Sequence, residues 1–148
     1  MSAALLDVNV VVALLWRPHL HHGAAMRWMD RNQNAPWATC SLTQAGFVRV
    51  VSNPRINAAA PTQAEAIALL KLSTESSNRH QFWADTLPLT AINPGLRDRI
   101  RGHNQVTDAY LLALTVQNEG RFVTFDSGVE SLAPKGSPEH KVLLVLKP

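Results

Sequence analysis

Two short apolar runs decide the fold: Ala3-Ala4-Leu5-Leu6-Asp7 and Arg121-Phe122-Val123-Thr124-Phe125-Asp126. Each run has the length and composition of a buried strand, and each ends in an aspartate. Strand-like pieces of this kind alternate along the chain with helix-like pieces. That alternation is typical of an α/β fold with a mostly parallel central sheet. We therefore predict a three-layer α/β/α architecture.

The remaining elements follow from apolar spacing and from proline and glycine positions. Further strands are expected at residues 37–40, 85–92 and 141–146, and residues 131–139 are expected to be loop. Helices are expected where apolar residues recur at helical spacing, and these regions are residues 10–15, 24–29, 43–52, 62–76, 94–100 and 108–119. Thr62 and Glu65 have the spacing of a capping box. Thr107 is expected to cap the helix that begins at Asp108, and Gly120 is expected to end it in the left-handed conformation.

Length and composition limit the class of protein. A chain of 148 residues predicts one domain spanning residues 1–148, and 46% hydrophobic with 17% charged residues is an ordinary globular composition. The single cysteine, Cys40, excludes an internal disulfide and fits a reducing compartment. The apolar run at residues 3–15 contains Asp7 and Asn9 and is shorter than the roughly 20 residues of a membrane span. No membrane association is expected, and the default location is the cytoplasm.

The charge balance is mildly basic. The net charge is +3, the sequence pI is near 9.5, and ten of the fourteen basic residues are arginine. Arginine suits phosphate oxygens, so a basic surface around an acidic pocket would fit a nucleic acid. Arg97, Arg99 and Arg101 precede the helix of Asp108 and are candidates to line a groove that binds a nucleic acid backbone. The alternative is a solvated, charged helix face.

Three aspartates are expected to meet at one edge of the sheet. Asp7 and Asp126 each follow a predicted strand, and Asp108 opens a predicted helix. Ligands of open α/β sheets bind outside the carboxyl ends of the strands. Three acids there repel one another unless a cation compensates, and hard cations such as Mg²⁺ take oxygen ligands. The pattern favours metal-assisted phosphate chemistry, although each aspartate alone also fits an ordinary turn or cap.

The order and spacing of four segments resemble the PIN-domain ribonucleases, and within them the VapC-like toxins of toxin–antitoxin pairs. The resemblance covers nearly the whole chain and rests on residues 5–9, 43–50, 106–114 and 122–126. It implies an endoribonuclease that depends on Mg²⁺ or Mn²⁺, with Asp7, Asp108 and Asp126 as metal-binding catalytic carboxylates. It also implies an RNA substrate, a cognate antitoxin as partner and a homodimer.

The resemblance extends to neighbours of the acids and includes one departure. By similarity, Asn9, Thr107 and Ser127 would orient the ligands through hydrogen bonds. Capping is the alternative role for Asn9 and Thr107. The family often has a glutamate where this chain has Gln44. A neutral amide there leaves three formal negative charges, which fits one divalent ion better than two.

Other classes of function fit less well. Gln44 keeps open a second hypothesis, in which the chain is a catalytically weak module that binds RNA or an antitoxin. A phosphoacceptor signalling domain would need paired acids after the first strand and a late lysine, but Asp7 stands alone and Lys135 lies in a predicted loop. His19, His21 and His22 suggest zinc, but no second cysteine or histidine pair lies at finger spacing.

Overall fold

The central sheet has five parallel strands. In the computed structural model, which describes residues 2–148, the strand order is β3-β2-β1-β4-β5. The strands are β1 (Ala4–Leu6), β2 (Trp37–Cys40), β3 (His80–Trp83), β4 (Arg121–Thr124) and β5 (Leu143–Val145). The parallel α/β sheet predicted from the sequence is confirmed.

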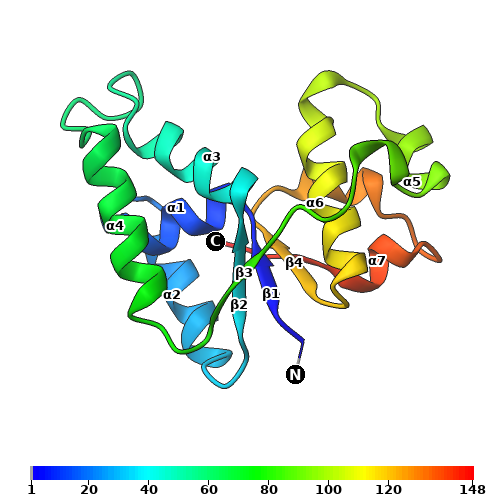
Figure 1. Cartoon of the computed structure of the whole chain (residues 1–148), viewed down its shortest axis with the longest axis horizontal. Coiled ribbons are helices and arrows are strands. Elements are labelled where there is room, and N and C mark those ends of the chain that lie inside the picture. Colours follow the sequence, from blue (N-terminus) through cyan, green and yellow to red (C-terminus); the bar gives the residue numbers. More distant parts are fainter. Residues whose placement is uncertain (1) are drawn as a thin grey trace.

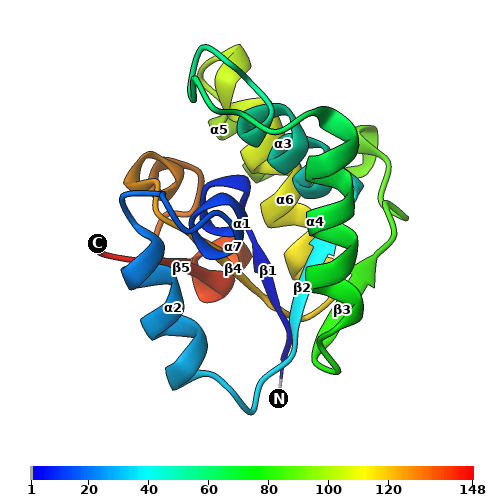
Figure 2. The ribbon, with the colours of Figure 1, turned by 90° about the vertical axis from the view of Figure 1, so that its left-hand side faces the viewer.

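Helices cover both faces of the sheet, as Figure 1 shows. One layer contains α1 (Val8–Leu15), α2 (His22–Arg31), α3 (Ser41–Val51) and α4 (Gln63–Glu75). The other contains α5 (Pro94–Arg99), α6 (Val106–Gln117) and α7 (Pro138–Val142). Figure 2 views the first layer from its outer side, with α2 and α4 on either side of β1 and β2. Three short 3₁₀ helices span Leu89–Ala91, His103–Gln105 and Ser127–Leu132.

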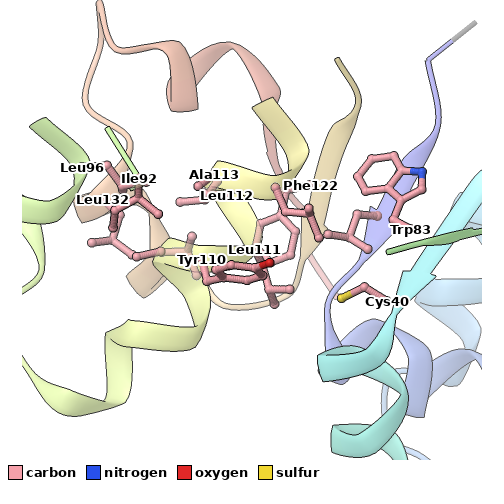
Figure 3. Packing of buried hydrophobic residues seen from close by; sticks show 14 of the residues in the cluster. Cys40, Trp83, Ile92, Leu96, Tyr110, Leu111, Leu112, Ala113, Phe122 and Leu132 are labelled. Atoms are coloured by element: carbon pink, nitrogen blue, oxygen red, sulfur yellow. The ribbon is translucent and has the colours of Figure 1, made fainter. Parts of the chain in front are cut away.

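Successive residues of each strand point to opposite faces of the sheet and pack into two apolar cores. Leu5 and Phe122 point to the face covered by α6, whereas Leu6 and Val123 point to the face covered by α1 and α3. Because both faces are covered, the strands are near-continuous apolar runs, as expected for buried parallel strands. Figure 3 shows the first core, where α6 packs against Phe122 and, beyond it, Cys40 and Trp83. No helix within residues 2–148 is long and apolar enough to cross a bilayer.

The order in which strands are added to the sheet reverses between β1 and β4. From β1 it adds β2 and then β3 on one side, and it returns to add β4 and β5 on the other side. Parallel sheets of this kind bind ligands at such a switch point, outside the carboxyl ends of the two neighbouring strands. Asp7 follows β1 and Asp126 lies two residues beyond β4, so the topology itself places both acids there.

Some predicted elements were wrong. The third strand is His80–Trp83 and not residues 85–92, which hold a 3₁₀ turn instead, because Pro88 interrupts the strand pattern. The last strand is shorter than predicted because α7 occupies residues 138–142, part of it within the predicted loop.

The predicted ends of α6 were also wrong. This helix begins at Val106 after Gln105, so Thr107 lies inside its first turn and is not its cap. The left-handed residue after it is Glu119, with φ of 53°, and not Gly120. The predicted capping box is confirmed, because Thr62 accepts a hydrogen bond from the Glu65 N–H and the Glu65 side chain accepts one from the Thr62 N–H.

Candidate active site

Asp7 lies at the junction of β1 and α1. Its Oδ1 accepts a hydrogen bond from the Val8 N–H at 2.7 Å, so the side chain caps α1. Its own N–H donates to the Val123 carbonyl at 2.9 Å, which ties it to β4. The residue is only 7% exposed. A carboxylate suits the positive end of a helix, and this explains how the chain tolerates a buried acid here.

Thr124 joins the two aspartates that follow β1 and β4. Its buried hydroxyl donates to Asp7 Oδ2 at 2.7 Å and accepts from the Asp126 N–H at 3.0 Å. Asn9 Nδ2 donates to the same hydroxyl at 3.1 Å. Sequence reasoning missed Thr124, although a lone polar residue within the apolar strand Phe122 to Phe125 was the available signal.

Asn9 bridges the same two strand ends. Its amide nitrogen lies 3.4 Å from Asp7 Oδ2, and its carbonyl oxygen accepts from the Phe125 N–H at 3.1 Å. These hydrogen bonds fix Asn9 between the two strand ends, and its role in orienting metal ligands stays a prediction. Asp126 Oδ1 accepts a hydrogen bond from the Gly128 N–H at 2.8 Å. This aspartate therefore also stabilises a turn, which is the alternative role that the sequence allowed for it.

Asp108 lies in the first turn of α6, across from the other two acids. Burial, the charge of Asp7 and the charge of Asp126 raise its pKa to about 6. Burial also raises the pKa of Asp7, against the lowering effect of its hydrogen bonds with Thr124 and Val8, and Asp126 raises it further. The fold thus brings Asp7, Asp108 and Asp126 within range of mutual repulsion.

The chemistry of these groups fits a hard divalent cation. The donors are carboxylate oxygens, and a positive ion would relieve the repulsion that, after burial, raises the pKa values of Asp7 and Asp108. Within residues 2–148, no group of three Asp, Glu, His or Cys side chains is arranged so that it could hold a metal ion by itself. Mg²⁺ commonly keeps several waters and takes only one or two carboxylates directly, so an open arrangement of this kind suits it.

Gln44 extends from the first turns of α3 toward β2. Its Nε2 donates to Thr39 Oγ1 at 3.0 Å, and that hydroxyl lies 2.8 Å from His80 Nε2. Within the described residues, Gln44 hydrogen-bonds none of the three aspartates. Within residues 2–148, the amide oxygen of Gln44 makes no hydrogen bond.

The other predicted site residues receive less support. Thr107 and Ser127 are exposed, and neither side chain makes a hydrogen bond within residues 2–148. Arg99 donates to buried Glu139 at 2.8 Å and to the Leu132 carbonyl at 2.9 Å, so it supports the fold around α7. Arg97 pairs with exposed Asp98. A role for Arg97 and Arg101 in binding RNA stays a prediction.

The histidine cluster has local roles. His22 Nδ1 donates to the Ala13 carbonyl at 2.8 Å, and His19 Nδ1 accepts from the His21 N–H at 3.0 Å. The His21 ring lies against Phe125, with ring centroids 5.2 Å apart. These contacts hold together the segment between α1 and α2, and they favour a local structural role of the three histidines over a zinc site.

Comparisons with known proteins agree with this geometry. The family model of the PIN domain matches residues 4–134. Ribonuclease VapC39 of Mycobacterium tuberculosis is 43% identical over 136 residues, covering 92% of this chain and 97% of that protein. Ribonuclease VapC44 of the same organism is 45% identical over 137 residues, covering 93% and 95%.

A solved structure supports the fold. VapBC2 from Rickettsia felis, bound to a DNA fragment from their promoter, superposes with a TM-score of 0.66 over 98% of this chain and 99% of that one. Its sequence identity is 13%, so this likeness shows the fold alone. The chain belongs to the PIN-domain family. Within that family it is a relative of the VapC ribonucleases, and the resemblance predicted from the sequence is confirmed.

We expect Thr124→Val to destabilise the protein by about 1–3 kcal/mol, because the buried carboxylate of Asp7 loses a donor. Valine keeps the shape of threonine, so lost packing contributes little. Divalent binding should also weaken, since Asp7 is then held less firmly. Urea unfolding and calorimetric titration with Mn²⁺ measure the two effects.

Thr115→Val is the matched control for that substitution. Thr115 is equally buried, but its hydroxyl donates within α6 to the Leu111 carbonyl at 2.7 Å and contacts no acid. It should leave Mn²⁺ binding unchanged. If both variants bind Mn²⁺ equally well, Thr124 has no role in holding the metal-binding acids.

Proposed function

We propose that the chain is a divalent-metal-dependent endoribonuclease and the toxin of a toxin–antitoxin pair. The observation that carries the proposal is the placement of Asp7, Asp108 and Asp126 at the switch point of the sheet, where burial and the neighbouring acids raise the pKa values of Asp7 and Asp108. Perturbed acids gathered at such a place are typical of catalytic sites. The names of relatives at 43–45% identity support the choice of RNA as substrate.

In this proposal Asp7, Asp108 and Asp126 hold Mg²⁺ or Mn²⁺, and Gln44 contributes a neutral oxygen. When bound, the ion would polarise a phosphate oxygen and lower the pKa of a water that attacks phosphorus. Asn9 and Thr124 keep Asp7 and the Asp126 backbone in place by the hydrogen bonds described above. Burial and its acidic neighbours raise the pKa of Asp108 to about 6, so it is suited to accept the proton of the attacking water.

A second candidate is a module that binds RNA or an antitoxin without cleaving. It is favoured by Gln44, whose amide nitrogen is held by Thr39 and which brings no charge to the site. The two candidates differ in their response to metal. Only the nuclease requires a divalent ion for a chemical step.

The deciding experiment is incubation of the purified protein with a mixed tRNA and rRNA pool in Mg²⁺, in Mn²⁺ and in EDTA. Discrete cuts that need metal support the nuclease. Retention of RNA without cuts under all three conditions supports the binding module. A cognate antitoxin and a homodimer complete the proposal, and light scattering of the purified chain tests the dimer.

We expect Gln44→Glu to tighten Mn²⁺ binding by about tenfold, because in this proposal the side chain lies beside the cation and the change adds a fourth negative charge there. Gln33→Glu is the control, since Gln33 is exposed in the turn after α2 and adds the same charge away from the site. Calorimetric titration compares the two variants. If they bind Mn²⁺ equally well, Gln44 does not face the ion.

A further inference from the structure

A pocket of about 450 Å³ opens beside the acidic site, and the proposed function leaves it without a role. Its wall includes the end of β2 at Cys40, the segment after β3 and the first turns of α6. Thr107 lines it and is the residue directly before Asp108. A group held in the pocket would therefore lie next to the proposed reaction centre.

The pocket has the composition of a ligand site, with apolar walls and a few polar groups. Leu42, Leu89 and Val106 contribute apolar side chains that stay 42%, 47% and 37% exposed. Between them lie polar groups that make no side-chain hydrogen bond within residues 2–148, namely those of Ser41, Asp85, Thr107 and Tyr110.

Asp85 is the charged group of this pocket. The sequence placed it at the beginning of the third strand and so away from the site, but β3 ends at Trp83. Asp85 therefore follows the carboxyl end of its strand, like Asp7 and Asp126. Within the described residues it forms no ion pair. Its carboxylate is left free to accept hydrogen bonds from a ligand.

Tyr110 supplies the second directional group. Figure 3 shows it on α6 with its hydroxyl turned toward β2, where Cys40 lies. Burial raises the pKa of Tyr110, and the charges of Asp85 and Cys40 raise it further. The hydroxyl therefore keeps its proton at neutral pH and can donate as well as accept.

We propose that this pocket binds one unstacked base of the RNA next to the scissile phosphate, and that Asp85 selects a base with an exocyclic amino group. The proposal rests on the proposed function. Proteins that read RNA sequence commonly take single-stranded bases into apolar pockets and hydrogen-bond their edges. A carboxylate accepts from an amino group such as cytosine N4. Uracil has a carbonyl O4 there, and its one donor on this edge, N3–H, lies between two carbonyl oxygens that a carboxylate repels.

The charge of the pocket favours a base over the backbone. Asp85 would repel a phosphate, whereas the N–H edge of a base is neutral and complementary to it. The apolar walls would cover the faces of a ring. Uracil is therefore the base that this position should reject.

The first test sequences RNA from a randomised single-stranded pool after retention by Asp108→Asn protein, which is expected to cut far more slowly than wild type. The same selection is repeated with Asp85→Asn added, and with Asp30→Asn added as control. Asp30 is an exposed carboxylate on α2, outside the pocket. We expect one position to disfavour uracil by about tenfold, and Asp85→Asn alone to abolish this because its amide can donate to uracil.

The second test reads the ends produced when the wild-type chain and its Asp85→Asn variant cut the same pool. One outcome is that the wild-type chain retains RNA with a base preference that Asp85→Asn abolishes, and yet does not cut it. That result would support the base-binding pocket and contradict the proposed nuclease activity. Cleavage or retention whose base preference Asp85→Asn does not change would overturn the pocket assignment. So would a loss of antitoxin affinity in Asp85→Asn with unchanged base preference, because the pocket would then serve a protein partner.

Discussion

Asp108→Asn is expected to lower RNA cleavage by about 100- to 1,000-fold and, at neutral pH, to leave the fold as stable as before or more stable. In the proposed mechanism Asp108 is one of three carboxylates that hold the metal ion, and losing one group that stabilises the transition state commonly costs this much. Asparagine keeps the size of the side chain, so packing around the first turn of α6 is preserved. Opposite effects on activity and stability would mark a group retained for function.

The stability half of this prediction has a defined pH dependence. The pKa of Asp108 is about 6 in the folded chain, against an ordinary value of 3.8. Between these values the folded protein holds the proton and the unfolded protein releases it. The protonated Asp108 therefore makes its full contribution to the free energy of unfolding below about pH 4. That contribution is lost as the pH rises through 6. The melting temperature of Asp108→Asn relative to wild type should rise over this interval and then level off.

Thermal melts of both proteins from pH 4 to 8, without metal and with Mn²⁺, measure the effect. Mn²⁺ should raise the melting temperature of wild type and close the gap, because the ion compensates the repulsion that destabilises the acids. Asp30→Asn provides the control for a lost charge on an exposed helix face. A difference between Asp108→Asn and wild type that stays constant with pH would mean that Asp108 is not under strain in the folded protein. Unchanged cleavage would remove it from the reaction.

The acids could be predicted because strand ends are easy to locate in buried parallel strands. The apolar runs before Asp7 and Asp126 are almost uninterrupted, and parallel strands bring their carboxyl ends to one edge. Asp108 followed from the periodic helix behind it. The contacts that hold these acids were harder to predict. Thr124 bonds Asp7 across 117 positions of sequence, and only the pairing of β1 with β4 brings the two together.

The pocket beside the site could not be predicted from the sequence because the third strand was predicted at the wrong residues. Residues 85–92 contain Leu87, Leu89 and Ile92, whose spacing looks like a strand, whereas His80–Trp83 contains polar residues and looks less buried. The structure explains both: β3 is an edge strand with exposed Gln81 and Phe82, so it needs no continuous apolar run. In the predicted strand Asp85 is the first residue, at the amino end of the sheet. In the structure it comes after the last residue of β3, at the carboxyl edge where the proposed active site lies.

Gly120→Ala is expected to destabilise the protein by about 2–3 kcal/mol, which for a chain of this size lowers the melting temperature by about 5–10 °C. A methyl group at Gly120 would lie 2.6 Å from the Ala3 carbonyl oxygen and 2.5 Å from the Trp83 ring. The Ala3 carbonyl accepts from the Arg121 N–H at 2.9 Å, so it cannot move without disturbing the pairing of β1 with β4. Trp83 is buried and has little room to turn.

Gly23→Ala is the matched control, because a methyl group there would meet only the end of the flexible Arg27 side chain, at 3.2 Å. Alanine also favours the helical conformation that Gly23 already has, so this variant should be as stable as wild type or slightly more stable. Urea unfolding curves for the three proteins give the comparison. Equal loss in both variants would mean that glycine is needed for a general reason and not for the close approach of β1 and β4. A loss specific to Gly120→Ala would show that this approach, which also brings Asp7 to Thr124, depends on a residue without a side chain.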